Sequence, residues 1–330
     1  MTPLKQALLK REAEKHLSES IVEWRPLKNT GSLNVSFFGV TKSGIAFTAK
    51  YNVICKETLQ QRKIRKEIDE KTDLIFPKLI CSYVSFSLPL HTCFLTEWIE
   101  GDCLDLQSLN DDPKSLYDCA VLVSKKLKTV HAIETTYRFA PRSLKRDYKR
   151  ALRKIRFFRI NVPHLSEFVK FVDGNLNKIK NTPQGYVHFD FHPGNIIKQG
   201  GDYRIIDLET ICVSELWRDL VYAAEINFPE QHKFWLLFLL GYFDGKIPNE
   251  FFLQSKIYVI IYMLMLAKYN RNGDMEMYFN LVNKVYEDYN SLRTDISDWM
   301  IKTATELSTG TEFFVEGLND ILKSTDNSLY

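Results

Sequence analysis

The chain reads His188-Phe189-Asp190-Phe191-His192-Pro193-Gly194-Asn195 and, ten residues further on, Ile205-Ile206-Asp207-Leu208-Glu209. Asp190 and Asn195 are five residues apart, and Asp207 lies twelve residues beyond Asn195. Carboxylates and imidazoles transfer protons, and carboxylate and amide oxygens bind hard cations. The concentration of these side chains in one short span marks it as the candidate functional centre.

The segment between Asn195 and Asp207 predicts a β-hairpin. Ile196-Ile197 and Tyr203-Arg204-Ile205-Ile206 have the apolar character of short strands, and Gly200-Gly201-Asp202 between them predicts a tight turn. Such a hairpin would bring Asp207 back beside Asn195. A carboxylate and an amide oxygen that converge form a site suited to magnesium.

The full pattern is H-x-D-x-x-x-x-N followed by an aspartate at a strand end, the layout of phosphoryl-transfer sites in kinases. The residues His188–Ile197 and Ile205–Glu209 resemble the aminoglycoside phosphotransferase and choline kinase family more closely than they resemble protein kinases. The resemblance implies an α+β, bilobal protein-kinase-like fold, with a small β-sheet N-lobe and a larger helical C-lobe.

The resemblance also assigns roles within the loop. Asp190 is expected to be the catalytic base or the group that orients an acceptor hydroxyl, and Asn195 and Asp207 are expected to hold magnesium. His192 would contact the γ-phosphate or only brace the turn. His188 would pack under the loop.

Length and composition are those of an ordinary folded protein. The 330 residues, 45% hydrophobic and 26% charged, suffice for two lobes and a sizeable core. A net charge of +3 does not indicate a nucleic-acid partner. The six cysteines are scattered without a C-x-x-C pair, which favours free thiols in a reducing compartment over a zinc site or a disulfide scaffold.

No targeting or membrane-spanning segment is visible in the sequence. Met1–Ser20 is charged and amphipathic, without the apolar core of a signal peptide. The most apolar run, Tyr258–Ala267, is about half the length needed to span a bilayer. We therefore expect a cytoplasmic protein with no membrane span. Nothing in the sequence indicates its oligomeric state.

The first hundred residues predict a β-rich lobe. The predicted helices are Leu4–Leu17 and Lys56–Lys71, and the predicted strands are Ile21–Trp24, Val35–Val40, Ile45–Tyr51, Lys78–Ser85 and Thr92–Trp98. Between the first two strands, Thr30, Gly31 and Ser32 lie in a segment of small and polar residues. Their backbone N–H groups could contact phosphate oxygens, and a plain hairpin turn is an equal alternative.

Lys50 and a carboxylate on the next helix are candidates for nucleotide binding. The kinase-like fold places a lysine at this strand to hold the α- and β-phosphates. Its partner would be Glu67 or Glu70, and Glu67 fits better because Ile64 and Ile68 mark the core face of the helix.

The segment Glu97-Trp98-Ile99-Glu100-Gly101 resembles the hinge of the family, where adenine bonds to backbone groups. We therefore expect Glu97 and Ile99 to contact the nucleotide base. The alternative is an ordinary strand end and turn. The lobe boundary is predicted near residue 100, with the N-lobe at 1–100 and the C-lobe, which holds the catalytic loop and acceptor site, at 101–330.

The remainder predicts helices at Leu116–Ile133, Arg142–Arg159, Leu165–Ile179, Gln231–Tyr242, Asn249–Tyr269, Met275–Tyr289, Arg293–Leu307 and Thr311–Leu322. A further helix begins at Trp217, and its Asp219 is expected to be a structural cap or a loop anchor. His131 is expected to be a packed core residue.

Two charged segments bear on the acceptor. Arg142–Arg159 carries nine basic residues and one acid, Asp147, whereas Glu97–Asp112 carries six acids and no base. A basic rim would suit a neutral or anionic acceptor, and an acidic rim would suit a polycationic aminoglycoside. Either segment could also be a solvated face.

These observations predict magnesium-dependent transfer of the γ-phosphoryl group of ATP to a hydroxyl of a small molecule of aminoglycoside, amino alcohol or sugar type. GTP remains open as the donor. Only ten residues separate Asp207 from Arg218, and no Ala-Pro-Glu follows, so a peptide-binding activation segment does not fit there. The alternatives are a protein or glycan kinase and a nucleotide-binding pseudokinase that acts as a scaffold.

Overall fold

The computed structural model describes residues 2–27, 35–53, 56–72, 75–88, 91–109, 112–135, 143–179, 182–227, 231–270, 275–310 and 315–326. The chain divides into two compact units. The first unit is Met1–Leu104 with Pro193–Cys212, and the second is Asp105–His192 with Val213–Tyr330.

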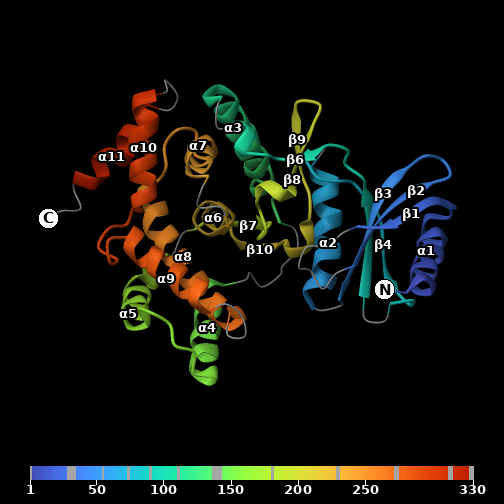
Figure 1. Cartoon of the computed structure of the whole chain (residues 1–330), viewed down its shortest axis with the longest axis horizontal. Helices are drawn as coiled ribbons and strands as arrows, with labels where there is room; N and C mark the ends of the chain where they lie inside the picture. Colours follow the sequence, from blue (N-terminus) through green and yellow to red (C-terminus); the bar gives the residue numbers. More distant parts are fainter. Residues whose placement is uncertain are drawn as a thin grey trace. The chain divides into compact units, whose positions relative to one another are not determined.

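The first unit is built on a five-stranded antiparallel sheet of order β1-β2-β3-β5-β4 (Figure 1). Its strands are β1 (Ile21–Pro26), β2 (Val35–Thr41), β3 (Ala46–Val53), β4 (Leu79–Ser85) and β5 (His91–Glu97), and its helices are α1 (Pro3–Leu17) and α2 (Lys56–Lys71). The predicted β-rich lobe is therefore present, with element ends within one or two residues of those expected.

Successive side chains along each strand point to opposite sides, so this sheet has two different faces. One face carries apolar side chains that pack under α1 in a single core cluster, which includes Leu9, Ala13, Phe37, Phe47, Ala49, Tyr51, Cys93 and Leu95. The residues next to them in sequence, such as Ser36, Thr48, Lys50, Asn52 and Phe94, point to the other face and line a cavity. Figure 1 shows α1 and α2 on opposite sides of the sheet.

A smaller three-stranded sheet of order β6-β8-β9 also belongs to the first unit. It contains β6 (Asp102–Cys103) and the hairpin formed by β8 (Ile196–Gln199) and β9 (Asp202–Ile205). Gly200 and Gly201 form the turn with φ of 56° and 89°, a left-handed conformation that glycine adopts without steric cost. The predicted hairpin is confirmed.

The boundary at residue 100 is close to the observed end of the first segment at Leu104, but the prediction did not assign Pro193–Cys212 to the first unit. Backbone hydrogen bonds explain why this hairpin belongs there. The N–H of Leu104 donates to the carbonyl of Ile196 at 2.8 Å, and the N–H of Ile205 donates to that of Ile75 at 2.8 Å. These pairings join residues far apart in sequence, which local patterns do not reveal.

The second unit is mainly helical (Figure 1). Its helices are α3 (Pro113–His131), α4 (Leu144–Phe158), α5 (Leu165–Asn175), α6 (Trp217–Val221), α7 (His232–Tyr242), α8 (Asn249–Asn270), α9 (Met275–Asp288), α10 (Asp298–Gly310) and α11 (Val315–Asp326), and β7 (Gln184–Val187) pairs with β10 (Cys212–Glu215). Every residue of α7 from Phe234 to Tyr242 is buried, so this helix forms the centre of the unit.

The predicted start of α10 at Arg293 is wrong, because the helix begins at Asp298. Asn290, Ser291 and Leu292 adopt successive left-handed conformations with φ of 46°, 54° and 67°. This run forms the turn after α9, and the N–H groups of Arg293 and Thr294 bond back to the carbonyls of Asn290 and Tyr289, so these two residues belong to the turn and not to a helix. The predicted residues Thr311 to Phe314 of the last helix lie outside the described residues.

Helix α8 is longer than the apolar run that the sequence suggested. Its segment Asn249–Lys268 is long and apolar enough to cross a membrane by length and composition, and it is the one such helix found in the described residues. However, 72% of this apolar stretch is buried inside the structure, as in the core helix of a folded domain.

Candidate active site

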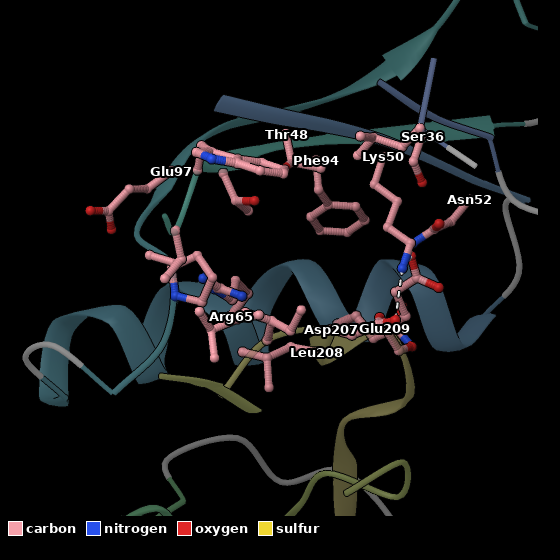
Figure 2. A pocket seen from close by; sticks show the side chains of 18 of the residues that line it. Ser36, Thr48, Lys50, Asn52, Arg65, Phe94, Glu97, Asp207, Leu208 and Glu209 are labelled. Atoms are coloured by element: carbon pink, nitrogen blue, oxygen red, sulfur yellow. Dashed lines mark hydrogen bonds and ion pairs between the residues drawn. The ribbon is translucent and has the colours of Figure 1, made fainter. Parts of the chain in front are cut away.

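The first unit contains a cavity of about 500 Å³ beneath the polar face of its large sheet (Figure 2). Strands β2, β3 and β5 supply Ser36, Thr48, Lys50, Asn52, Phe94 and Thr96, helix α2 supplies Gln61 and Arg65, and the segment after β9 supplies Ile206, Asp207, Leu208 and Glu209. The cavity has a polar end at Lys50 and a more apolar end at Trp98 and Ile99. It therefore suits a ligand with a charged and an aromatic part.

Lys50 is placed at the polar end by β3, opposite Ser36 of β2 and Phe94 of β5. Its Nζ lies 2.9 Å from Oδ2 of Asp207 and 2.5 Å from Oε1 of Glu209. Figure 2 shows the lysine extended toward both carboxylates. The strand position predicted for Lys50 therefore brings it to the same place as Asp207.

The structure corrects the expected role of Glu67. Its carboxylate pairs with Lys71 one helical turn away, at 2.8 Å, whereas the described partners of Lys50 are Asp207 and Glu209. The reason is helical geometry. Gln61 and Arg65, four residues apart, face the cavity, and a helix of 3.6 residues per turn directs Glu67 to another side. The alternative, Glu70, is exposed.

The hairpin brings Asn195 and Asp207 together as predicted. The N–H of Ile206 donates to the carbonyl of Asn195 at 2.8 Å, so Asp207 is one residue from a direct backbone link to Asn195. Asp207 has φ of 64° and ψ of 62°, an unfavourable conformation for a residue with a side chain. The hairpin therefore holds this carboxylate at a strained position.

The donor set fits a magnesium ion. Oδ1 of Asp207 is buried and has no hydrogen-bond partner among the described residues, so it is available as a ligand. In the described part of the chain, no cluster of three or more His, Cys, Asp or Glu side chains forms a metal cage. Magnesium bound through one or two carboxylates, with water and phosphate completing its shell, needs no such cage.

The predicted hinge lies at the apolar end of the cavity. The carboxylate of Glu97 accepts hydrogen bonds from the N–H of Lys78 at 3.2 Å and from Nη2 of Arg204 at 3.2 Å, so this side chain supports the fold. Ile99 lines this end of the cavity and is 6% exposed. Thr30, Gly31 and Ser32 lie outside the described residues.

Arg65 is a further polar group of this cavity, which the sequence did not single out. It is 6% exposed, its Nε donates to Asp69 at 3.0 Å, and its Nη2 has no partner in the described residues. Burial lowers the pKa of Arg65. Gln61, one turn earlier, donates from Nε2 to the carbonyl of Glu209.

The second unit holds the other predicted catalytic residues. The side chain of Asp190 is 44% exposed, and its Oδ1 lies 3.8 Å from Nε2 of His192. The N–H of Asp190 donates to Nδ1 of His188 at 3.2 Å, and His188 is 1% exposed. His188 therefore packs beneath the loop, while Asp190 remains accessible to a reactant.

Asp219 anchors this loop. Its two carboxylate oxygens accept the N–H groups of His188 and Phe189, each at 2.7 Å, and His131 contacts the same carboxylate at 3.1 Å. Phe189 has φ of 65°, so the residue before Asp190 is in a left-handed conformation. The expectation that Asp219 is a loop anchor is confirmed, and His131 is buried as expected.

Arg218 adds a second support that the sequence did not reveal. It is fully buried, its guanidinium carbon lies 4.7 Å from the centre of the Phe189 ring, and its Nη2 donates to Asp147 of α4 at 2.6 Å. Burial alone would lower the pKa of Arg218, but Tyr222 and Asp147 raise it above its ordinary value. Sequence signals for these roles were weak, because an Arg-Asp pair at a helix start is common.

Glu209 is the other residue whose role was missed. It closes the Ile-Asp-Leu-Glu stretch and contacts Lys50 more closely than Asp207 does. Its spacing two residues after Asp207 was the available signal. The intervening turn η4 (Leu208–Thr210) is what directs both carboxylates to one lysine.

Comparison with known proteins supports this arrangement. A model of the phosphotransferase enzyme family matches residues 76–250, which is 175 of the 330 residues. The chain therefore belongs to the phosphotransferase enzyme family, as the loop and strand-end motifs predicted. No curated protein matches the chain significantly.

Solved structures share the fold at low sequence identity. The gentamicin complex of the aminoglycoside phosphotransferase APH(2″)-IIa is 17% identical, with a TM-score of 0.62 over 88% of this chain and 99% of that chain. A choline/ethanolamine kinase family protein from Mesorhizobium loti is 15% identical, with a TM-score of 0.58 over 97% and 99% of the two chains. An amicoumacin kinase in complex with AMP-PNP and Ca²⁺ is 10% identical, with a TM-score of 0.60 over 87% and 96%. The bilobal kinase-like fold is thus confirmed.

Proposed function

We propose that this protein transfers the γ-phosphoryl group of ATP to a hydroxyl of a small molecule in a magnesium-dependent reaction. The observation that carries the proposal is the contact of Lys50 with Asp207 at one end of a cavity of about 500 Å³. A backbone hydrogen bond from Ile206 to Asn195 places the segment of Asp207 beside that of Asn195. Membership of the phosphotransferase enzyme family supports it. Its neighbours in complex with gentamicin and with AMP-PNP support a small-molecule acceptor and a nucleotide donor.

The first unit would bind the nucleotide. The backbone N–H of Ile99 and the carbonyl of Glu97 would contact the base, and Lys50 would contact the phosphates. Thr30, Gly31 and Ser32 remain proposed phosphate contacts. Glu67 is not proposed as the partner of the lysine, because it pairs with Lys71.

Asn195 and Asp207 would hold magnesium, which when bound screens the negative charge of the phosphates. The buried, unpaired Oδ1 of Asp207 supports this assignment. The amide oxygen of Asn195 would be the second protein ligand of the magnesium ion. The charge on Asp207 also orients Lys50, which keeps the ammonium at the phosphate end of the cavity.

Asp190 would accept the proton of the acceptor hydroxyl or orient that hydroxyl. Its carboxylate is accessible, and its backbone is fixed by His188 and by the anchored Phe189. His192, 3.8 Å from Asp190, would brace the carboxylate or contact the γ-phosphate. The free thiols of the five described cysteines fit the cytoplasmic location that we propose for the protein.

The test is an ADP-release screen with aminoglycosides, amino alcohols, sugars, nucleosides and peptides, with mass analysis of each product. Asp190→Asn should lower turnover with the best acceptor by about 100- to 10,000-fold, because the loop loses its proton acceptor. Its affinity for Mg-ATP should change little. Asp118→Asn is the matched control, since Asp118 is exposed on α3.

The outcomes separate the proposal from its alternatives. Phosphorylation of peptides alone would identify a protein kinase. Nucleotide binding without a product from any acceptor class would favour a pseudokinase scaffold. Wild-type turnover in Asp190→Asn would show that the loop has been misinterpreted.

A further inference from the structure

Helix α4 carries a dense cluster of positive charge on its exposed side. The exposed basic residues are Lys145, Arg146, Lys149, Arg150, Arg153 and Arg156, with Arg159 at the C-cap, and they are called the basic face here. Lys154 is half-buried beside them. The helix contains one acid, Asp147, which is buried against Arg218. No carboxylate of α4 therefore offsets the basic face.

The basic face is opposite to the side by which α4 supports the catalytic loop. Leu144, Asp147, Tyr148, Ala151 and Ile155 form the buried side, at the spacing of three and four residues that marks one helical face. Asp147 on this side contacts Arg218, which in turn stacks on Phe189 of the loop. The cluster is thus directed away from the loop, which argues against a rim of the acceptor site.

Such a cluster is unfavourable for the isolated protein. Lys145 and Lys149, and likewise Arg146 and Arg150, are like charges four residues apart, an arrangement that destabilises a helix. Burial and the neighbouring charges of Arg150 and Lys268 lower the pKa of Lys154. Lys268, at the end of α8, extends the positive region beyond α4.

An exposed aromatic side chain lies within the same face. Phe157 is 78% exposed, and it follows Arg150 by seven residues and Arg153 by four, which places all three on one side of the helix. Full exposure of a phenylalanine among arginines is costly in water. Lipid headgroups and acyl chains can satisfy both kinds of side chain at once.

We propose that the basic face of α4, together with the exposed Phe157 near the C-terminal end of the helix, binds the surface of a membrane rich in anionic phospholipids. The charges would contact phosphate headgroups, and Phe157 would insert at the boundary with the acyl chains. A single nucleic-acid strand is a poorer partner, because such strands are bound by successive aromatic platforms, and the described residues of α4 expose only Phe157 as a large apolar group. The proposal goes beyond the phosphotransferase activity and does not depend on it.

The first test is co-sedimentation of the full-length protein with vesicles. Vesicles of phosphatidylcholine with about one-third phosphatidylglycerol should bind the protein at low salt, and pure phosphatidylcholine vesicles should not. Binding should weaken strongly at about 0.5 M NaCl, where screening shortens the range of the charges. Failure to bind anionic vesicles at low salt would overturn the proposal.

The second test reverses the charge of the face. Arg146→Glu, Arg150→Glu and Arg153→Glu combined should lower vesicle affinity by on the order of 100-fold or more. The matched control is Arg11→Glu, Lys15→Glu and Lys42→Glu combined, three exposed positions in the first unit with the same change in net charge. Equal losses in both triple variants would mean that only the net charge matters, which contradicts a specific face.

The third test locates the aromatic residue. Vesicles of brominated phosphatidylglycerol should quench the tryptophan fluorescence of the Phe157→Trp variant. The quenching should be stronger than that of the wild-type protein, whose fluorescence comes from its own five tryptophans. Phe157→Ser should weaken binding most at high salt, where charge contributes least. Unchanged quenching, or tight binding to duplex DNA that exceeds binding to anionic vesicles, would refute the assignment.

Discussion

Asp219→Asn tests whether a buried carboxylate holds the loop that carries Asp190. Both carboxylate oxygens of Asp219 accept a backbone N–H at 2.7 Å, from His188 and Phe189, and the residue is 1% exposed. Asparagine retains one acceptor oxygen and presents an NH₂ group in place of the other. One backbone N–H would therefore face a donor and remain unpaired.

The magnitude follows from these contacts. A hydrogen bond to a charged group contributes about 1.5–3 kcal/mol, and a buried unpaired donor costs about 1–3 kcal/mol more. We expect Asp219→Asn to lower the free energy of unfolding of the second unit by about 2.5–6 kcal/mol. For a unit of this size, about 2–4 °C per kcal/mol gives a Tm lower by roughly 5–24 °C.

Calorimetry and hydrogen exchange would measure the effect. Peptides that span residues 184–192 should lose amide protection in Asp219→Asn, whereas ATP affinity should stay close to wild type because the proposed nucleotide cavity belongs to the first unit. Asp118→Asn, at an exposed position of α3, should leave both quantities unchanged. If Asp219→Asn unfolds at the wild-type temperature with normal loop protection, the anchor is not energetically important.

Two further predictions concern other carboxylates. Asp207→Ala should abolish the magnesium-dependent part of the thermal stabilisation by ATP, because it removes the proposed ligand Oδ1. If ATP with magnesium raises the Tm of the variant as much as that of the wild type, the metal role of Asp207 is contradicted. Burial raises the pKa of Glu225 from 4.5 to about 7, so the folded protein retains a proton that the unfolded chain releases between these values, and stability falls as pH rises across this window. Glu225→Gln should therefore gain stability relative to wild type between pH 5 and pH 8, by up to about 3 kcal/mol, and a pH-independent difference in Tm would refute this cause.

Sequence patterns predicted the elements whose formation is local. The helix Lys56–Lys71 was placed at its observed bounds, and the Gly200-Gly201 turn identified the hairpin. The hairpin in turn placed Asp207 beside Asn195, because its register follows from the turn. Both elements form from contacts between near neighbours in sequence, so local patterns were sufficient to predict them.

The failures concern contacts that local patterns cannot specify. Choosing Glu67 required knowing which side of α2 faces Lys50, and two core isoleucines, Ile64 and Ile68, defined only the apolar side. The observed partners, Asp207 and Glu209, are more than 150 residues from Lys50 along the chain and reach it from the segment after β9. The support of Phe189 by Arg218 likewise depends on tertiary packing.

The charges around Lys50 bear on whether a nucleotide would bind there with or without a divalent metal ion. Asp207 and Glu209 contribute two negative charges and Lys50 one positive charge, so this end of the cavity is net negative when the three groups are ionised. A triphosphate is itself strongly anionic and would be repelled by the unpaired charge. A divalent cation reverses the sign of the site, and it would leave Lys50 free to exchange a carboxylate for a phosphate oxygen. If the proposed function holds, the pairing of Lys50 with two carboxylates would favour binding of the nucleotide together with its metal over binding of the nucleotide alone.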